Sequence, residues 1–263
     1  MKKIQQNIRY RDRVPVNEYL KELKLPVMAS QYKDKAKEAI KRNLSYEEYL
    51  GELIQEELII KREKRIQSRL NKAGFPVMKT IDSFDFNHMP GLNRKEILDF
   101  HRGEFIEKKE NIIFIGSPGV GKTHLATTIG IEACKLGKKV RFFTAMGLVN
   151  LLLEAQKEQR LSKIMRSLLK PELLIVDELG YIPFSQAGSQ LLFQLFSDRY
   201  QRGSVIITTN LEFSSWTNVF LEKKMTAALL DRLTHQAHVI LMNGGSYRFK
   251  QRIKLGKAKK SAA

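Results

Sequence analysis

The chain has 263 residues, of which 43% are hydrophobic, enough for one α/β domain with a packed core and a small appendage. Its single cysteine, Cys134, excludes a disulfide framework and any metal site built from several cysteines, and we expect this thiol to pack in the core. No apolar run approaches the ~20 residues that a membrane-spanning helix needs, and the polar N-terminus lacks the hydrophobic segment of a signal peptide. We therefore expect a cytoplasmic protein without a membrane partner.

Positive charge is concentrated at the two ends of the sequence. The whole chain carries a formal net charge of +18. Residues 1–75 contribute +7, residues 76–246 only +4, and residues 247–263, with seven basic and no acidic side chains, another +7. A weakly charged centre with two basic ends favours a polyanion such as nucleic acid as the partner. The alternative is a basic protein with a solvated tail.

The first third of the chain is predicted to be helical. Apolar residues at helical spacing indicate helices over residues 16–23 and 28–42. Ser45-Tyr46-Glu47-Glu48 has the pattern of a capping box that opens a long helix through Leu70. Gly74 and Pro76 then end the helical pattern.

Strand and helix patterns alternate from residue 111 onward. Nearly continuous apolar runs predict strands at residues 111–116, 139–145, 173–178, 204–210 and 237–242. Helices are expected between them, near residues 122–135, 146–169, 186–201 and 222–235. This alternation predicts a five-stranded parallel α/β sheet sandwiched by helices, with right-handed crossovers.

Residues 116–123 form a glycine-rich loop between the first of these strands and its helix, the pattern of a P-loop. Three glycines let the loop backbone turn its amides toward phosphate oxygens. Lys122 is expected to reach the β- and γ-phosphates, and the Thr123 hydroxyl to ligate Mg²⁺. The positive end of the following helix adds to the anion site. The predicted ATP-binding residues are Gly116, Pro118, Gly119, Val120, Gly121, Lys122, Thr123 and His124.

Two further strands end in polar residues that suit ATP hydrolysis. Asp177 and Glu178 close the apolar run that begins at Leu173. Asp177 is expected to hold the Mg²⁺ shell, and Glu178 to polarise the attacking water as general base. Asn210 ends the next strand, where it would help to orient that water. An acidic pair that merely caps a strand, and an asparagine that merely forms a turn, are the alternatives.

These motifs together resemble the AAA+ superfamily. Three further segments resemble IstB, the ATP-binding helper of an insertion-sequence transposase: Gly180-Tyr181-Ile182-Pro183, Asp231-Arg232-Leu233-Thr234-His235 and Gly245-Ser246-Tyr247-Arg248. IstB is related to the DnaC and DnaI helicase loaders. The resemblance covers residues from about 10 to 252. It divides the chain into a helical N-terminal domain at residues 1–75 for DNA, partner or oligomer contacts, an AAA+ ATPase domain at 76–246 and a basic tail at 247–263.

The resemblance implies a bacterial, DNA-associated homo-oligomer that assembles on duplex DNA and stimulates a transposase. It also implies active sites at subunit interfaces, completed by an arginine of the neighbouring subunit. Arg232 matches the position of that arginine, while an intrachain ion pair with Asp231 or another carboxylate is the alternative. Arg199 and Arg202 are other candidates. Too few residues follow Met242 for the helical lid of typical AAA+ proteins, and whether Arg248 replaces the lid's arginine stays open.

A row of basic residues follows the second predicted strand. Lys157, Arg160, Lys163 and Arg166 are spaced three apart, which predicts one helix face, and the resemblance suggests that this face contacts DNA. A solvated face is the alternative. Phe84 and Phe86 are expected to pack at the domain edge or near the adenine. A helicase loader remains the second functional hypothesis. A P-loop kinase or GTPase that acts on a small molecule is disfavoured for two reasons. The sequence motif that recognises guanine is missing, and the basic ends of the chain would have no role in binding a small phosphate acceptor.

Overall fold

The computed structural model describes residues 16–245 and residue 247 of the chain. The chain divides into two compact units, and the division falls between Gln67 and Ser68, inside the long helix α3 (Tyr46–Ala73). None of the described helices is long and apolar enough to cross a membrane.

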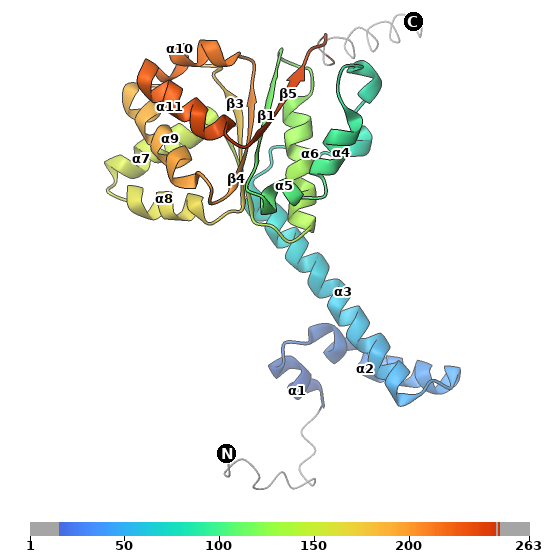
Figure 1. Ribbon diagram of the computed structural model, residues 1–263. Helices are drawn as coiled ribbons and strands as arrows, with labels where there is room; N and C mark the ends of the chain where they lie inside the picture. Colours follow the sequence, from blue (N-terminus) through green and yellow to red (C-terminus); the bar gives the residue numbers. More distant parts are fainter. Residues whose placement is uncertain (1–15, 246, 248–263) are drawn as a thin grey trace, which may run out of the picture. The chain divides into compact units, whose positions relative to one another are not determined.

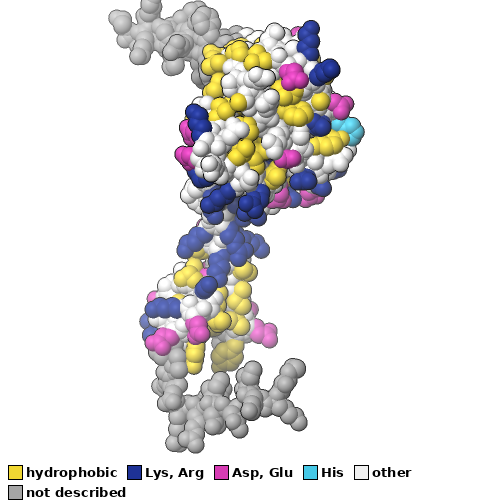
Figure 2. Space-filling view, turned by 90° about the vertical axis from the view of Figure 1, so that its left-hand side faces the viewer, with side chains coloured by type: hydrophobic (Ala, Val, Ile, Leu, Met, Phe, Trp, Pro, Cys, Tyr) yellow, Lys and Arg dark blue, Asp and Glu magenta, His cyan; other side chains and the backbone are white. Residues whose placement is uncertain are grey.

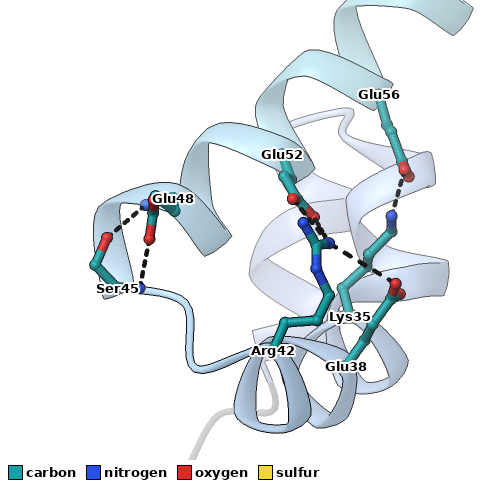
Figure 3. A network of polar contacts seen from close by, with 7 residues as sticks. All are labelled: Lys35, Glu38, Arg42, Ser45, Glu48, Glu52 and Glu56. Carbon is teal, nitrogen blue, oxygen red and sulfur yellow. Dashed lines mark hydrogen bonds and ion pairs between the residues drawn. The ribbon is translucent and has the colours of Figure 1, made fainter.

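The smaller unit contains α1 (Val16–Glu22), α2 (Pro26–Arg42) and most of α3 (Figure 1). The predicted capping box is confirmed: the Ser45 amide donates to Glu48 Oε2 (2.7 Å) and the Glu48 amide donates to Ser45 Oγ (3.2 Å) (Figure 3). These bonds occupy backbone donors that have no partner inside the helix, which explains why α3 begins where it does. The second helix starts at Pro26, two residues earlier than predicted, because proline is favourable in a first helical turn.

The larger unit is built on a five-stranded sheet in which every pairing is parallel. The strands are β1 (Asn111–Gly116), β2 (Val140–Thr144), β3 (Leu173–Leu179), β4 (Ser204–Thr209) and β5 (Ala237–Met242), each within one residue of its predicted limits. Their order across the sheet is β2-β3-β4-β1-β5. The carboxyl ends of β1, β4 and β3 therefore lie next to one another, at the edge where parallel sheets bind ligands.

Helices cover both faces of this sheet, and each face has its own apolar core (Figure 1). One face carries α4 (Arg94–Phe100), α5 (Glu104–Glu107) and α6 (Lys122–Lys135). The other carries α7 (Ala145–Lys157), α8 (Leu161–Leu169), α9 (Gln186–Arg199), α10 (Thr217–Phe220) and α11 (Lys223–Thr234). Short 3₁₀ helices lie at Ile81–Ser83, Phe86–His88 and Phe213–Trp216. Cys134 is fully buried, as predicted.

The predicted fold class is confirmed, with a helical N-terminal region and a sandwiched parallel sheet, and among the described residues no helical lid follows β5. One local expectation is wrong. Residues 146–169 are interrupted between α7 and α8, where Gln159 adopts a left-handed φ of 55°. The Arg160 amide then donates to the Ala155 carbonyl (2.7 Å), which ends α7 in the manner of a Schellman motif.

Candidate nucleotide-binding site

The loop between β1 and α6 needs its glycines for steric reasons. A Cβ atom on Gly116 would lie 2.3 Å from the carbonyl oxygen of Met242 in β5, so a larger residue does not fit between the two strands. Gly119 and Gly121 have φ angles of 83° and 106°, in the left-handed region that glycine adopts without strain. The loop thereby turns directly from the end of β1 into the first turn of α6.

Lys122 and Thr123 open α6, where exposed backbone N–H groups and the helix dipole favour an anion. The Lys122 ammonium donates to the carbonyl oxygens of Gly116 (2.6 Å) and Ser117 (2.9 Å). The Thr123 hydroxyl donates to both carboxylate oxygens of Asp177, at 2.9 and 3.1 Å. The structure thus brings together the two motifs that the sequence places 54 residues apart.

Asp177 and Glu178 lie where β3 departs from its regular pairing with β4. The register shifts between Val176 and Leu179, and Glu178 has a φ of 60°. The Thr208 hydroxyl in β4 accepts a hydrogen bond from the Glu178 amide (2.9 Å) and donates to Asp177 Oδ1. Asp177 is consequently buried, whereas Glu178 is exposed at the strand end.

Thr208 is a residue that the sequence prediction missed. Its hydroxyl contacts both acidic residues, although it belongs to a different strand. The sequence did contain a signal for this role, because Thr208 is a polar residue in the otherwise apolar strand β4. A fully buried hydroxyl needs hydrogen-bond partners. Asn210 directly follows β4 and is exposed. Because β4 lies between β1 and β3, Asn210 emerges at the same sheet edge as Glu178 and the loop.

A cleft of about 650 Å³ borders the glycine-rich loop. Residues 119–124 line one side of it, together with Asp177 and Glu178. The other side is made by the segment before α4, from which Pro76, Val77, Lys79, Ser83, Phe84, Asp85, His88 and Met89 contribute. Tyr247 also lines the cleft: its amide donates to the Gly119 carbonyl (3.1 Å), and its ring centroid lies 5.3 Å from that of His88. Phe84, which the sequence placed at the domain edge or near the adenine, lines this second wall, whereas Phe86 does not.

His124 connects the loop helix to that second wall. Its Nε2 lies 3.1 Å from the carbonyl oxygen of Thr80 and 3.2 Å from Ser83 Oγ, and its ring packs edge-on against Phe84. Burial lowers the pKa of His124, which keeps the imidazole neutral at pH 7. Phe84 itself packs so close to Gly121 that a Cβ there would lie 2.7 Å from its ring. Phe84 therefore packs against the phosphate loop.

Arg232, the candidate intersubunit arginine, lies on α11 and is half-buried. Its Nη1 donates to Ser197 Oγ (3.0 Å), and its guanidinium stacks over the ring of Phe193. Among the described residues it forms no ion pair, so the alternative of a pair with Asp231 is not realised. Arg199 is fully buried and donates to three backbone carbonyls, which makes it unavailable to a neighbouring subunit, whereas Arg202 is exposed.

The basic row does not form one helix face, contrary to the sequence prediction. Lys157 ends α7, Arg160 precedes α8 and pairs with Glu158, and only Lys163 and Arg166 share a helix. The reason is the left-handed turn that separates the two helices. All four side chains are nevertheless exposed. Figure 2 shows Lys and Arg side chains gathered along the lower edge of the larger unit, the edge where Figure 1 places α8.

The fold and the cleft together define a P-loop nucleotide-binding protein of the AAA+ type. The model of the family described as IstB-like ATP binding protein matches residues 18–255, and the chain belongs to this family. The resemblance that the sequence motifs suggested is thereby confirmed.

The relatives and a solved structure agree with this assignment. The chain is 39% identical to the insertion sequence IS5376 putative ATP-binding protein of Geobacillus stearothermophilus, over 90% of this chain and 94% of that protein. It is 41% identical to the insertion sequence IS232 putative ATP-binding protein of Bacillus thuringiensis subsp. berliner, over 88% and 92% of the two chains. A crystal structure of DnaI, 20% identical, shares the fold with a TM-score of 0.52 over 62% of this chain and 90% of that one.

Proposed function

We propose that this chain is an ATP hydrolase that assembles on duplex DNA and recruits and stimulates the transposase of its insertion sequence. The observation that carries the hydrolase part is the contact between Thr123 and Asp177, with the exposed carboxylate of Glu178 beside it. At one edge of the sheet, this arrangement would supply a phosphate-binding loop, a pair of oxygens for a metal ion and a carboxylate to act as the base.

The cleft suits ATP in its shape and chemistry. Loop amides and Lys122 are positioned for the phosphates, and Phe84, Met89, Val77 and Tyr247 offer apolar and aromatic surface for the base. Val120 and His124 continue the lining next to the loop. Pro118, between the loop glycines, shapes the loop without contributing a backbone N–H.

Oxygen ligands are the chemistry that Mg²⁺ prefers, and the adjacent Thr123 hydroxyl and Asp177 carboxylate fit it. A bound Mg²⁺ would supply charge neutralisation for the terminal phosphates. Glu178 would accept a proton from the attacking water, and Asn210 would orient that water. Arg232 of a neighbouring subunit would stabilise the charge that develops on the terminal phosphate. The hydrogen bond from Arg232 to Ser197 could be exchanged at low cost for a contact with the phosphate of a neighbouring subunit.

DNA binding is supported by the charge distribution. Four exposed basic side chains surround the turn between α7 and α8: Lys157, Arg160, Lys163 and Arg166. Seven more basic side chains follow Tyr247 in the sequence, in a segment that lies outside the described residues. Phosphate contacts of this kind are sequence-tolerant and weaken strongly with salt. We assign residues 1–75 to DNA, partner and oligomer contacts, residues 76–246 to ATP hydrolysis and the basic tail at 247–263 to added DNA affinity.

The transposase is the partner of choice because the relatives named above are proteins of insertion sequences. A helicase loader is the second candidate, favoured only by the shared fold with DnaI. Binding assays with the transposase of the same element and with a replicative helicase separate the two. The first function requires that only the transposase is retained on the immobilised chain.

The hydrolase assignment is tested with Glu178→Gln. General-base catalysis contributes about 10²- to 10⁴-fold, so we expect phosphate release to fall at least a hundredfold while ATP still binds. The matched control is Glu154→Gln, which changes an exposed carboxylate on α7 and should leave turnover unchanged. Turnover of Glu178→Gln at the wild-type rate would show that another group is the base.

The assembly is tested by sedimentation with duplex DNA at fixed salt, in ATP, in ADP and without nucleotide. We expect large complexes only with ATP, and they should persist longest with Glu178→Gln. Equal DNA binding in all three states would separate the ATP site from DNA binding and contradict this part of the proposal.

A further inference from the structure

The chain that follows β5 forms a short strap that leads from the sheet to the nucleotide cleft. We use the name strap for Asn243, Gly244, Gly245 and Tyr247, the described residues that follow Met242. Because β5 is the edge strand beside β1, the strap begins next to the glycine-rich loop (Figure 1). Typical AAA+ proteins carry a helical lid at this point, whereas the strap is all that follows β5 in the described part of this chain.

The strap is attached to the wall of the cleft that precedes α4. A Cβ atom on Gly244 would lie 2.6 Å from the sulfur of Met89, so the strap backbone packs directly on this wall. The carbonyl oxygen of Gly245 lies 2.8 Å from Nε2 of His88. A carbonyl oxygen can only accept, so the imidazole donates this hydrogen bond. These contacts fix the strap just before Tyr247.

Tyr247 is the strap residue that lines the cleft. Its amide donates to the Gly119 carbonyl (3.1 Å), which attaches the strap to the P-loop as well. Its ring packs edge-on against the ring of His88, with the two centroids 5.3 Å apart. Both side chains are half-buried and both line the cleft. Two aromatic rings from distant parts of the sequence therefore border the same region of the cleft.

The strand order shows which end of the cleft these rings border. Asp177 and Glu178 end β3, which lies on the β4 side of β1, whereas the strap follows β5 on the other side of β1. The terminal phosphates belong at the acidic end, where the proposed metal ligand and general base lie. A nucleotide whose phosphates lie on Lys122 therefore extends its base toward the opposite end, where Tyr247 and His88 are found.

We infer that the ring of Tyr247 stacks on the base of the bound nucleotide, that His88 holds this ring in position, and that the strap closes the base end of the cleft as a lid would. This inference rests on the proposed ATP-binding function. Every nucleobase offers a flat aromatic face, so stacking strengthens the binding of ATP and GTP alike and does not choose between them. A ligand that has phosphates but no base gains nothing from the strap.

Titration calorimetry on the full-length chain with ATP, GTP and inorganic tripolyphosphate tests the stacking. For Tyr247→Ala we expect the Kd of ATP and of GTP to rise at least fivefold, the lower end of what base–aromatic stacking contributes. The Kd of tripolyphosphate should stay unchanged. Tyr247→Phe, which keeps the ring, should bind all three ligands like the wild type.

Tyr200→Ala is the matched control. Tyr200 is also half-buried and packs edge-on against a histidine, His235, with the ring centroids 5.9 Å apart. It precedes β4, however, and so lies at the opposite edge of the sheet from the cleft. This variant loses the same kind of ring pair, and we expect the Kd of ATP to stay at the wild-type value.

The outcomes separate this inference from the proposed function. An unchanged Kd of ATP in Tyr247→Ala would overturn the inference and leave the ATP hydrolase standing. An equal loss of tripolyphosphate affinity would also overturn it, since Tyr247 would then support the P-loop rather than the base. Tighter binding of ATP would show that the ring obstructs the cleft. A wild-type chain that binds neither ATP nor tripolyphosphate would contradict the proposed function itself.

Tyr247→Trp gives a spectroscopic test of the same contact. The native Trp216 is fully buried in the apolar core on the other face of the sheet, so its emission provides a constant background. We expect ATP and ADP to quench the added emission of Tyr247→Trp, and tripolyphosphate to leave it unchanged. An emission that stays constant while calorimetry shows ATP bound would refute stacking.

The positioning role of His88 is tested by combining His88→Ala with Tyr247→Ala. Alone, His88→Ala should raise KM for ATP at least twofold and leave kcat unchanged, because His88 lies at the end of the cleft away from Glu178. Added to Tyr247→Ala, it should raise KM no further, since the ring that it positions is already gone. Additive increases in KM would overturn this role of His88.

Discussion

The hydroxyl of Thr208 offers a sharp test of how the sheet holds its two acidic residues. The proposed change is Thr208→Val, which preserves the shape of the side chain and removes only the hydroxyl. Thr208 is 1% exposed, so water cannot replace the lost group from outside the strand. Both hydrogen bonds of this hydroxyl, from the Glu178 amide and to Asp177 Oδ1, disappear together.

The expected cost follows from these two bonds. A hydrogen bond to a charged group contributes about 1.5–3 kcal/mol, and a buried amide left without a partner costs about 1–3 kcal/mol. The Glu178 amide lies near the exposed end of β3, where water can partly satisfy it, so we expect a net loss of about 2–4 kcal/mol. For a domain of this size each kcal/mol lowers Tm by about 2–4 °C, which makes the change easily measured by thermal unfolding.

The same variant should also slow hydrolysis, because the hydroxyl positions Asp177 and Glu178 without touching ATP. We expect kcat for phosphate release to fall at least tenfold with little change in KM for ATP, since Lys122 and the loop stay in place. Thr208→Ser, which restores the hydroxyl, should recover both properties. Thr226→Val is the matched control: Thr226 is equally buried, but its hydroxyl donates only to a carbonyl of its own helix.

A Tm and a kcat for Thr208→Val within error of the wild type would refute this reasoning. That result would mean that the bulge in β3 is held by other contacts and that the hydroxyl is dispensable. A loss of stability with unchanged kcat would restrict Thr208 to a role in folding.

Two further predictions follow from the P-loop and the core. Gly116→Ala would bring a Cβ to 2.3 Å from the backbone oxygen of Met242, which cannot rotate away. We therefore expect a loss of stability of about 1–3 kcal/mol and at least tenfold weaker binding of a fluorescent ATP analogue. Normal binding would show that β1 and β5 can separate freely. Burial raises the pKa of the Cys134 thiol to about 11, well above its ordinary value near 9. Because the neutral thiol is the form favoured by folding, its contribution is fully present below pH 9 and is lost as the pH rises through 11. Denaturant titrations should therefore show a falling free energy of unfolding over this range, and a thiol reagent at pH 8 should label Cys134 only after unfolding.

The features that the sequence predicted depend on neighbours along the chain. The turn from β1 into α6 is specified by glycines that tolerate left-handed φ angles and by a helix start that attracts anions, both within eight residues. The capping box of Ser45 and Glu48 likewise involves residues three apart. Apolar runs of strand length marked all five strands. The central strands β1, β3 and β4 are buried on both faces, as expected of parallel strands, whereas β5 exposes Val239 and Leu241.

The break between α7 and α8 was missed although it is local. The three-residue spacing of the basic side chains indicates one helix face, whereas the chain turns at Gln159 through a left-handed conformation that the residue type does not signal. The consequence was an incorrect geometry for the basic row, although its residues are exposed as expected.

Only the tertiary structure decided how the strand ends meet. The order β2-β3-β4-β1-β5 places β4 between β1 and β3, which brings Thr208 to Asp177 and Glu178 across 31 and 30 positions in the chain. The wall of the cleft formed by residues 76–89, with His88 against Tyr247, also joins segments far apart in sequence. Hydrophobic periodicity fixes which side of a strand or helix is buried, but it does not fix which neighbour covers it. That choice depends on packing among segments distant in the chain.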